Sequence, residues 1–556
     1  MLKQVRLTSR GLSTLMPLVF GVSAAAQAAE WNEWRGPQRN GVVEKSPPLA
    51  TTWPDEGPRR LWLSEEEIPS GDTPGGYTGG GYGGLAVADG RVYCLFILPR
   101  KVPLATRTLT EQKLIGLGWP KVKPPEDLLK KAEQARVSDE RQALKDPREL
   151  ATWIKEWLET NADTEARRKY GAFVIDRLKR GKAALDLAVL DRLETIKDKP
   201  FPNQEALDAW FAENGIEGDL RKVIQSKIPD TETYRDTVIV CMDAATGKTV
   251  WKRLFPGGPF LPLYENVPSS GTPCVANGRL YVLGTNVEAF CLDARTGEKF
   301  WSAKIGSGRQ RDSHCSFIVA DGVAAVSAQP LIGFDAETGK EVWTHATFKE
   351  SWSSPALWLK DGKSYFVLRD GVKVVCLEPR SGTILWSMKD VAPEIIYSGS
   401  TPAVEGDGMA LGGRTGVRSY KLSLEKAEQL WNVDCPMDYC CSPTIYDGHV
   451  YVFGRGGATC INVETGKIAW QDKELKTGSY HSPLVADGKF FTQGFDKKQS
   501  GSFGDGSLFM VAASSEKGQV LAQARIRQTL CITPAVADGR IFCRLVKRVA
   551  CYDLRQ

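Results

Sequence analysis

The sequence is poor in the residues that build metal and haem sites. Its 556 residues include only four histidines, and no two cysteines or histidines stand at Cys-x-x-Cys or His-x-x-x-His spacing. A Cys-x-x-Cys-His sequence is therefore missing too, which excludes a c-type haem attached to this chain. Without ligand spacing of this kind we expect no bound metal.

The sequence also lacks a strong excess of charge and, after its start, any long apolar run. The net charge is +5, and removal of Lys3, Arg6 and Arg10 with the first 28 residues would leave 5 − 3 = +2. A nearly balanced chain has no electrostatic footprint for nucleic acid. No later stretch is apolar for long enough to cross a bilayer, so we expect neither a nucleic-acid partner nor a transmembrane segment.

The first 28 residues have the organisation of a signal peptide. A basic start precedes the apolar stretch "LMPLVFGVSAAA", and Ala26-Gln27-Ala28 offers small residues for cleavage. An uncleaved membrane anchor is the alternative, but no stop-transfer run supports it. No cysteine precedes Cys94, which argues against a lipid-anchored amino-terminal cysteine. We therefore expect an exported protein of the periplasm or cell envelope, or a secreted one.

What the sequence has in abundance is a repeated phrase with the pattern Asp-x-x-Thr-Gly-x-x-x-Trp. "CMDAATGKTVW" is the first copy, and each copy is typical of a strand, a tight turn and a second strand. The glycine suits a turn position with positive φ. Copies end at Trp251, Trp301, Trp343, Trp386, Trp431 and Trp470, and a further copy has Ala522 at the tryptophan position.

A second phrase alternates with the first. "TPCVANGRLYVLG" and its relatives place Asn-Gly or Asp-Gly between two alternating strands, which is a strong hairpin signal. Together the two phrases predict an all-β, eight-bladed β-propeller with four antiparallel strands in each blade. The last unit, "RVACYDLRQ", lacks its fourth strand, and the stretch around Trp62 has the form needed to supply it. We expect this N-terminal strand to close the ring.

These phrases resemble the PQQ-like (quinoprotein alcohol dehydrogenase-like) β-propeller family over residues 59–99 and 236–556. The resemblance rests on the repeated Asp-x-x-Thr-Gly-x-x-x-Trp pattern. It implies that each tryptophan docks against the neighbouring blade. That structural role falls on Trp62, Trp251, Trp301, Trp343, Trp386, Trp431 and Trp470.

Two regions do not share the repeat. Residues 29–58 form an N-terminal extension before the propeller. Residues 100–235 are rich in charge, lack cysteine and show helical periodicity, with Trp153, Ile154 and Trp157 on one face of a predicted helix. We expect an α-helical insertion between the second and third strands of blade 1. A solvated, only partly ordered insertion is the alternative.

Repeat position separates the cysteines into classes. One class occupies a small buried slot of the third strand, where cysteine packs as an apolar residue; it consists of Cys241, Cys291, Cys376, Cys460 and Cys551. Cys94 and Cys543 lie on the neighbouring second strands, so Cys94–Cys241 and Cys543–Cys551 are possible disulfides in an oxidising compartment. Cys435 is a possible partner for Cys440 or Cys441.

The adjacent residues Cys440 and Cys441 have two interpretations. Neighbouring Cα atoms lie about 3.8 Å apart, below the usual range for a disulfide, which favours two independent substitutions in a variable repeat slot. The alternative is a disulfide between adjacent cysteines, which enzymes of the resembled family use to hold a quinone.

The leading ends of the innermost strands predict a binding funnel around the propeller axis. An irregular, water-lined channel is the alternative. The candidate ligand-binding residues are Tyr82, His314, Trp352, Cys440, Cys441, Tyr480 and His481. The loops that lead into these strands add Glu265, Asn266, Arg309, Arg311, Asp312, Glu350, Glu394 and Asp438. We assign no catalytic residue.

The resemblance leaves two functions open. The first is a non-catalytic binding or assembly scaffold of the cell envelope, with no cofactor and with a protein, peptide or glycan as its partner. The second is an alcohol dehydrogenase that depends on PQQ and Ca²⁺. In that enzyme Trp352 would form the floor under the quinone, and Asp312, Glu350 or Glu394 would be calcium ligands. No sequence motif places those roles, so we favour the scaffold.

Overall fold

The computed structural model describes residues 30–70, 80–259, 271–305, 314–328, 330–349, 352–390, 399–413, 415–437, 440–454, 456–476, 481–494, 506–529 and 531–555. The predicted signal peptide lies outside these residues. The chain divides into two compact units. The first comprises Met1–Leu98, Asp236–Gly257 and Pro262–Gln556, and the second comprises Pro99–Arg235 and Gly258–Leu261.

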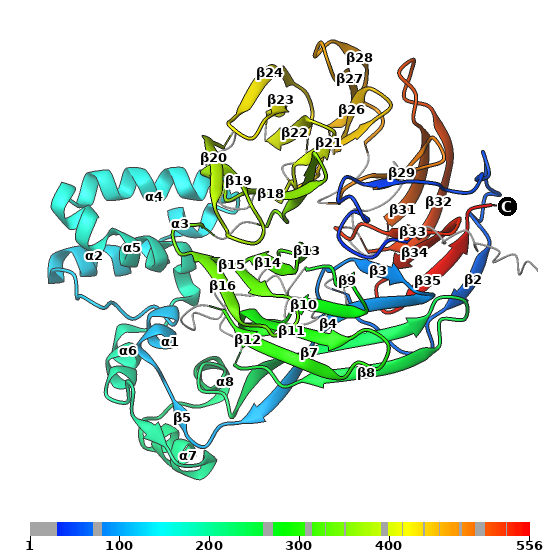
Figure 1. Ribbon diagram of the computed structural model, residues 1–556. Coiled ribbons are helices and arrows are strands. Elements are labelled where there is room, and N and C mark those ends of the chain that lie inside the picture. Colours follow the sequence, from blue (N-terminus) through cyan, green and yellow to red (C-terminus); the bar gives the residue numbers. More distant parts are fainter. Residues whose placement is uncertain are drawn as a thin grey trace, which may run out of the picture. The chain divides into compact units, whose positions relative to one another are not determined.

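The first unit is built from β-sheets, as the repeats predict. Its described residues form seven four-stranded sheets and one five-stranded sheet, seen in Figure 1. The innermost strands are β3 (Leu85–Ala88), β9 (Cys274–Ala276), β13 (Ile318–Ala320), β17 (Ala356–Lys360), β21 (Ala403–Glu405), β25 (Thr444–Tyr446), β29 (Leu484–Ala486) and β33 (Ala535–Ala537). The second strands are β4 (Arg91–Pro103), β10 (Arg279–Leu283), β14 (Val323–Ser327), β18 (Lys363–Arg369), β22 (Gly408–Gly413), β26 (His449–Gly454), β30 (Lys489–Gly494) and β34 (Arg540–Arg544).

The third and fourth strands complete each sheet. The third strands are β7 (Thr231–Asp243), β11 (Glu288–Asp293), β15 (Leu331–Asp335), β19 (Lys373–Leu377), β23 (Gly416–Leu422), β27 (Gly457–Asn462), β31 (Gly506–Ala512) and β35 (Val549–Asp553). The fourth strands are β8 (Thr249–Phe255), β12 (Lys299–Lys304), β16 (Glu341–His345), β20 (Ile384–Lys389), β24 (Ala427–Asp434), β28 (Ile468–Asp472), β32 (Val520–Gln528) and, from the N-terminal part of the chain, β2 (Arg60–Leu63). The short 3₁₀ helix η3 (Thr285–Val287) joins β10 to β11.

The two repeated phrases form the two kinds of turn. In the hairpin turns, pairs such as Asp89-Gly90 have positive φ at both residues, 50° and 69°, which fits the right-handed twist of the flanking strands. In the other turns the acidic side chain accepts hydrogen bonds from the turn itself: the backbone N–H of Thr246 donates to Asp243 Oδ1 at 2.9 Å. The hydroxyl and amides of that turn hold the pKa of Asp243 below its usual value.

Seven tryptophans connect consecutive sheets. Each donates its indole N–H to a backbone carbonyl in the turn between the third and fourth strands of the next sheet. The pairs are Trp62–Ala244, Trp251–Ala294, Trp301–Ala336, Trp343–Pro379, Trp386–Ser423, Trp431–Val463 and Trp470–Ser514, at 2.7–3.2 Å. The turn glycines accommodate the indole: a Cβ on Gly297 would lie 2.6 Å from Trp251.

A second series of contacts, which we call the hydroxyl belt, joins the innermost strands. A backbone N–H just before one innermost strand donates to a Ser or Thr hydroxyl just before the next. The steps run from Gly84 to Thr272, Ser316, Ser354, Thr401, Ser442, Ser482 and Thr533, at 2.8–3.3 Å. A Cβ on Gly84 would lie 3.4 Å from the carbonyl oxygen of Thr533, so the two ends of the belt are adjacent.

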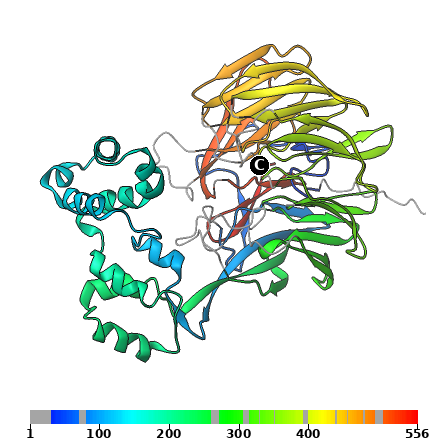
Figure 2. The ribbon, with the colours of Figure 1, turned by 90° about the vertical axis from the view of Figure 1, so that its left-hand side faces the viewer.

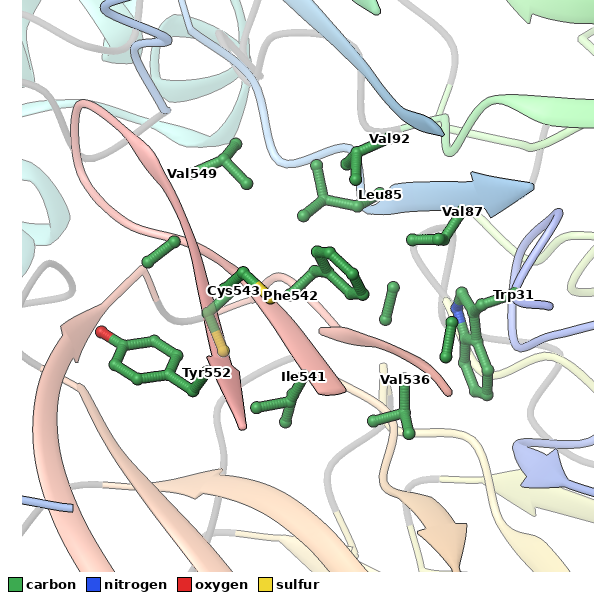
Figure 3. Close-up of a cluster of buried hydrophobic side chains, with 14 of the residues drawn as sticks. Trp31, Leu85, Val87, Val92, Val536, Ile541, Phe542, Cys543, Val549 and Tyr552 are labelled. Carbon is green, nitrogen blue, oxygen red and sulfur yellow. The ribbon is translucent and has the colours of Figure 1, made fainter. Parts of the chain in front are cut away.

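The N-terminal part of the chain joins the C-terminal sheet. β2 pairs antiparallel with β35, side by side in Figure 1, and β1 (Val42–Val43) pairs parallel with β29. Figure 3 shows the buried cluster that results, in which Trp31 and the β3 residues Leu85 and Val87 face Val536 and Phe542 of the last sheet. Residues from both ends of the chain therefore share one core.

The second unit is helical. It contains α1 (Glu111–Gly116), α2 (Glu126–Val137), α3 (Asp139–Ala143), α4 (Pro147–Asn161), α5 (Thr164–Arg180), η2 (Gly181–Ala183), α6 (Leu187–Glu194), α7 (Gln204–Glu213) and α8 (Gly218–Gln225), with the two-stranded sheet β5 (Arg107–Thr108) and β6 (Pro200–Phe201). Two apolar clusters hold two groups of helices, α2–α4–α5 and α1–α6–α7–α8, which are separate in Figure 2. None of the helices in the described ranges has the length and apolar character to span a membrane.

Candidate functional site

The innermost strands of the first unit surround a space that has two ends, one on each side of the hydroxyl belt. We call the end before the belt, where the innermost strands begin, the leading mouth. We call the end after the belt, where the Asp-Gly hairpins turn, the turn mouth. The predicted funnel residues precede the belt in sequence, so they belong to the leading mouth.

His314 and Trp352 form an aromatic pair at the leading mouth. They stand just before β13 and β17, in neighbouring sheets, and their ring centroids are 4.6 Å apart with the planes inclined by 58°. Both side chains are half-buried, as is Tyr82 before β3. A tilted aromatic pair with exposed edges offers apolar area together with a polar imidazole, which suits contact with another molecule.

Several predicted site residues lie outside the described residues. Tyr480 is one of them. The others are the loop residues Glu265, Asn266, Arg309, Arg311, Asp312, Glu350, Glu394 and Asp438.

His481 is buried in its own sheet. Its side chain is about 1% exposed, and Nε2 accepts a hydrogen bond from the backbone N–H of Gln493 at 3.0 Å and lies 2.7 Å from Thr492 Oγ1. Burial lowers the pKa of His481 to about 3, so the imidazole is neutral at pH 7. Its contacts are with β30, which gives it a packing role rather than a place on the funnel wall.

Cys440 and Cys441 are both enclosed, at 7% and 1% exposure. Cys440 packs against the neighbouring sheet, where a Cβ on Gly399 would lie 3.2 Å from the sulfur. Cysteine therefore fills the space that Gly399 leaves, in the manner of the small apolar residues that occupy such slots.

The possible disulfides Cys94–Cys241 and Cys543–Cys551 are not formed, and all four residues are free thiols, as is Cys435. The reason is the alternation of side chains across a strand. Cys543 lies opposite Ala550 in the β34–β35 register, so Cys551, the next residue, points to the other face. Cys94 and Cys241 likewise pack in two different apolar clusters. Burial raises the pKa of Cys241 to about 11 and that of Cys551 to about 12, which makes both poor nucleophiles.

A buried ion pair stabilises the fourth sheet near the leading mouth. Arg369, at the end of β18, donates from Nε and Nη2 to the two oxygens of Asp390 at 2.9 and 2.6 Å, and both side chains are fully enclosed. Arg369 Nη1 also donates to the carbonyl of Gly412 in the next sheet at 2.7 Å. Both oxygens of the Asp390 carboxylate therefore accept hydrogen bonds from Arg369.

The turn mouth holds a feature that the sequence patterns did not reveal. Residues 31–43 cross it and bond to the innermost strands, and we call this stretch the N-terminal plug. It bonds to seven of the eight innermost strands or to the one or two residues just before them, at Val87, Val275, Phe317, Pro355, Thr401, Pro443 and Val485. Most of its bonds are to backbone N–H and C=O groups of the innermost strands, which carry no signature in sequence.

Comparison with known proteins gives the following. The family model for outer membrane protein assembly factor BamB matches residues 235–387 and 369–555. Outer membrane protein assembly factor BamB of Burkholderia pseudomallei is 25% identical over 224 residues, 36% of this chain and 55% of that protein. Quinoprotein alcohol dehydrogenase PedH of Pseudomonas putida is 28% identical over 143 residues, 22% of this chain and 24% of that protein. The chain thus spans about half of the first relative and a quarter of the second.

Two solved structures are also similar. BamB from Moraxella catarrhalis matches with a TM-score of 0.44 and 16% identity, over 57% of this chain and 89% of that one. The quinohemoprotein alcohol dehydrogenase from Comamonas testosteroni matches with a TM-score of 0.42 and 12% identity, over 58% and 72%.

Proposed function

The chain belongs to the family of PQQ-like repeat proteins described as outer membrane protein assembly factor BamB, and on this basis we propose that it is an exported, non-catalytic scaffold of the cell envelope. Its partner is a protein, and the binding surface is the leading mouth of the first unit. The named role of the family in assembly supports a protein partner over a glycan.

We propose further that residues 59–99 and 236–556, which make up most of the first unit, form a closed eight-bladed propeller interrupted by the helical insertion 100–235. The series of seven tryptophan contacts supports this, because it runs through all eight sheets in order. The pairing of β2 with β35 supports closure by the N-terminal strand. The adjacency of Gly84 and Thr533 supports the same conclusion for the inner ring.

The observation that carries the scaffold proposal is the N-terminal plug. Because this stretch is bonded across the turn mouth to seven innermost strands, that end of the axis is committed to the chain's own structure. The leading mouth is then the end left for a partner. Trp352 of its aromatic pair belongs to the residue types that are enriched at protein interfaces.

A second candidate is the PQQ- and Ca²⁺-dependent alcohol dehydrogenase, which the 28% identity to a quinoprotein favours. Calcium requires several oxygen ligands, with carboxylates foremost. The described candidate residues at the leading mouth include the half-buried rings of Tyr82, His314 and Trp352, and Asp390 nearby is paired with Arg369. No group of three His, Cys, Asp or Glu side chains suited to a metal occurs in the described ranges. The calcium ligands that the sequence suggests, Asp312, Glu350 and Glu394, lie outside the described residues, and we derive no reaction step from the cofactor.

Site-specific photocrosslinking in the envelope tests the scaffold proposal. A photoreactive residue at Tyr82 or Trp352 reports on the leading mouth, and one at Leu359, about 50% exposed on β17 beyond the belt, is the matched control. We expect one discrete protein adduct from the first two positions and none from the third. His314→Ala should weaken the adduct formed from Tyr82. Absence of adducts at the leading mouth, or equal adducts at Leu359, would overturn the proposal.

A further inference from the structure

Two arginines of the N-terminal plug are buried at the turn mouth. Arg35 and Arg39 are each about 1% exposed. Arg39 donates to the carbonyls of Pro355 and Phe317 at 2.6 and 2.8 Å and pairs with Glu33. Arg35 bonds instead to the sheet of β25, where its Nη2 donates to the carbonyl of Pro443 at 2.6 Å. The two side chains therefore anchor the plug to different sheets around the axis.

Among the described residues, Glu33 is the one acidic group that pairs with these two cations. Glu33 pairs with Arg39 and accepts a contact from the Cys274 thiol at 3.7 Å, and burial raises its pKa. No carboxylate in the described ranges bonds to Arg35: Nη2 also donates to the carbonyl of Asn40 at 2.8 Å and to Thr444 Oγ1 at 3.0 Å, and both of these acceptors are neutral. Two guanidinium groups and one carboxylate leave one positive charge buried.

Three nitrogens of the pair lack an acceptor. A guanidinium carries five N–H donors, yet Arg35 Nε, Arg35 Nη1 and Arg39 Nη2 are enclosed with no acceptor among the described residues. Burial together with the like charge of Arg39 lowers the pKa of Arg35 to about 9, so Arg35 remains charged at pH 7. A buried charge without a partner destabilises the folded state, and unbonded buried donors add to that destabilisation.

We propose that the N-terminal plug binds one small monovalent anion, of the size and charge of chloride, through Arg35 and Arg39. One negative charge balances the excess, and the donors that lack acceptors belong to both arginines. The enclosure of both side chains favours a single ion over a larger ligand such as a phosphate ester. The anion would neutralise the excess positive charge of Arg35 and Arg39. It would thereby stabilise the plug, which these two arginines attach to different sheets. This site is distinct from the leading mouth and does not depend on the proposed function.

The dependence of thermal stability on chloride tests the proposal. A ligand that binds only the folded state raises Tm with concentration, so Tm should rise when sodium chloride replaces sodium gluconate at constant ionic strength. Arg35→Met should abolish this rise. The control Arg59→Met removes an arginine whose side chain is 60% exposed and should keep it. A Tm independent of chloride in the wild-type protein would overturn the proposal, as would a rise that persists in Arg35→Met.

Anomalous diffraction from wild-type crystals grown in bromide tests the site even if Arg35→Met does not fold. We expect a single bromide peak within hydrogen-bonding distance of Arg35 and Arg39. Water alone at this position, with bromide only at exposed lysines and arginines, would show that the buried charge is tolerated without an anion and would refute the inference.

Discussion

Replacement of Gly339 by alanine tests directly whether tryptophan docking holds neighbouring sheets together. Gly339 lies in the turn before β16 with a φ of 70°. A Cβ at this position would lie 2.5 Å from the indole of Trp301, which comes from the preceding sheet. Gly362 is a matched control, because its φ is 75° and a Cβ there would meet nothing within 4 Å. Both changes impose the same backbone strain, and only the first forces the two sheets apart.

The expected losses of unfolding free energy follow from the backbone strain and from the clash with the indole. A side chain in the left-handed region costs about 1–2 kcal/mol, which is all that Gly362→Ala should lose. Overpacking adds about 1–3 kcal/mol, so Gly339→Ala should lose about 2–5 kcal/mol of unfolding free energy. Trp301→Leu removes the bond to the Ala336 carbonyl and much of the buried ring, and should cost about 3 kcal/mol.

A double-mutant cycle separates the clash from the strain. In the Trp301→Leu background the indole is gone, so Gly339→Ala should cost only about as much as Gly362→Ala, with a coupling of about 1–3 kcal/mol. Urea unfolding followed by far-ultraviolet circular dichroism gives the four free energies. Equal losses for Gly339→Ala and Gly362→Ala, or a coupling near zero, would refute the docking account.

Three further predictions concern other parts of the chain. Deletion of residues 30–66 removes the N-terminal plug and β2, and should lower Tm of the whole first unit because β35 keeps β34 but loses its second partner, β2; an unchanged Tm would speak against closure. Replacement of residues 101–234 by a short turn should leave a soluble, β-rich protein because β4 still pairs with β7, and insoluble product would count against a separable insertion. Burial lowers the pKa of His481 to about 3 against about 6.5 in an unfolded chain, so the unfolded state takes up a proton first as pH falls below about 6.5. Unfolding free energy should therefore decrease from pH 6.5 towards pH 3, by at most about 1.4 kcal/mol per pH unit from this residue, and a slope unchanged in His481→Gln would contradict the assignment.

The sheets and the family were predictable from the repeats because each repeated residue stabilises a turn or a contact close to it in sequence. The turn aspartates accept bonds from residues two and three places later, and the hairpin glycines adopt positive φ, so both leave a fixed spacing in sequence. The same regularity brought His314 and Trp352 together, since equivalent positions in consecutive sheets are neighbours around the axis.

Features that depend on three-dimensional context were not predictable. The possible disulfides were proposed from neighbouring strands, but the side chains point to opposite faces, and only the register shows this. His481 occupies a predicted funnel position yet bonds to β30. The sequence indicates only an N-terminal extension at residues 29–58, because the contacts that Arg35 and Arg39 make with backbone carbonyls can be made to any sequence.

The most direct test of the scaffold account is addition of PQQ with Ca²⁺ to the purified protein, followed by absorbance titration and dye-linked alcohol oxidation. Because the scaffold account assigns no cofactor to the chain, we expect no stoichiometric binding of the quinone and no turnover. Binding of one PQQ per chain with sustained alcohol oxidation would contradict the scaffold and establish the dehydrogenase.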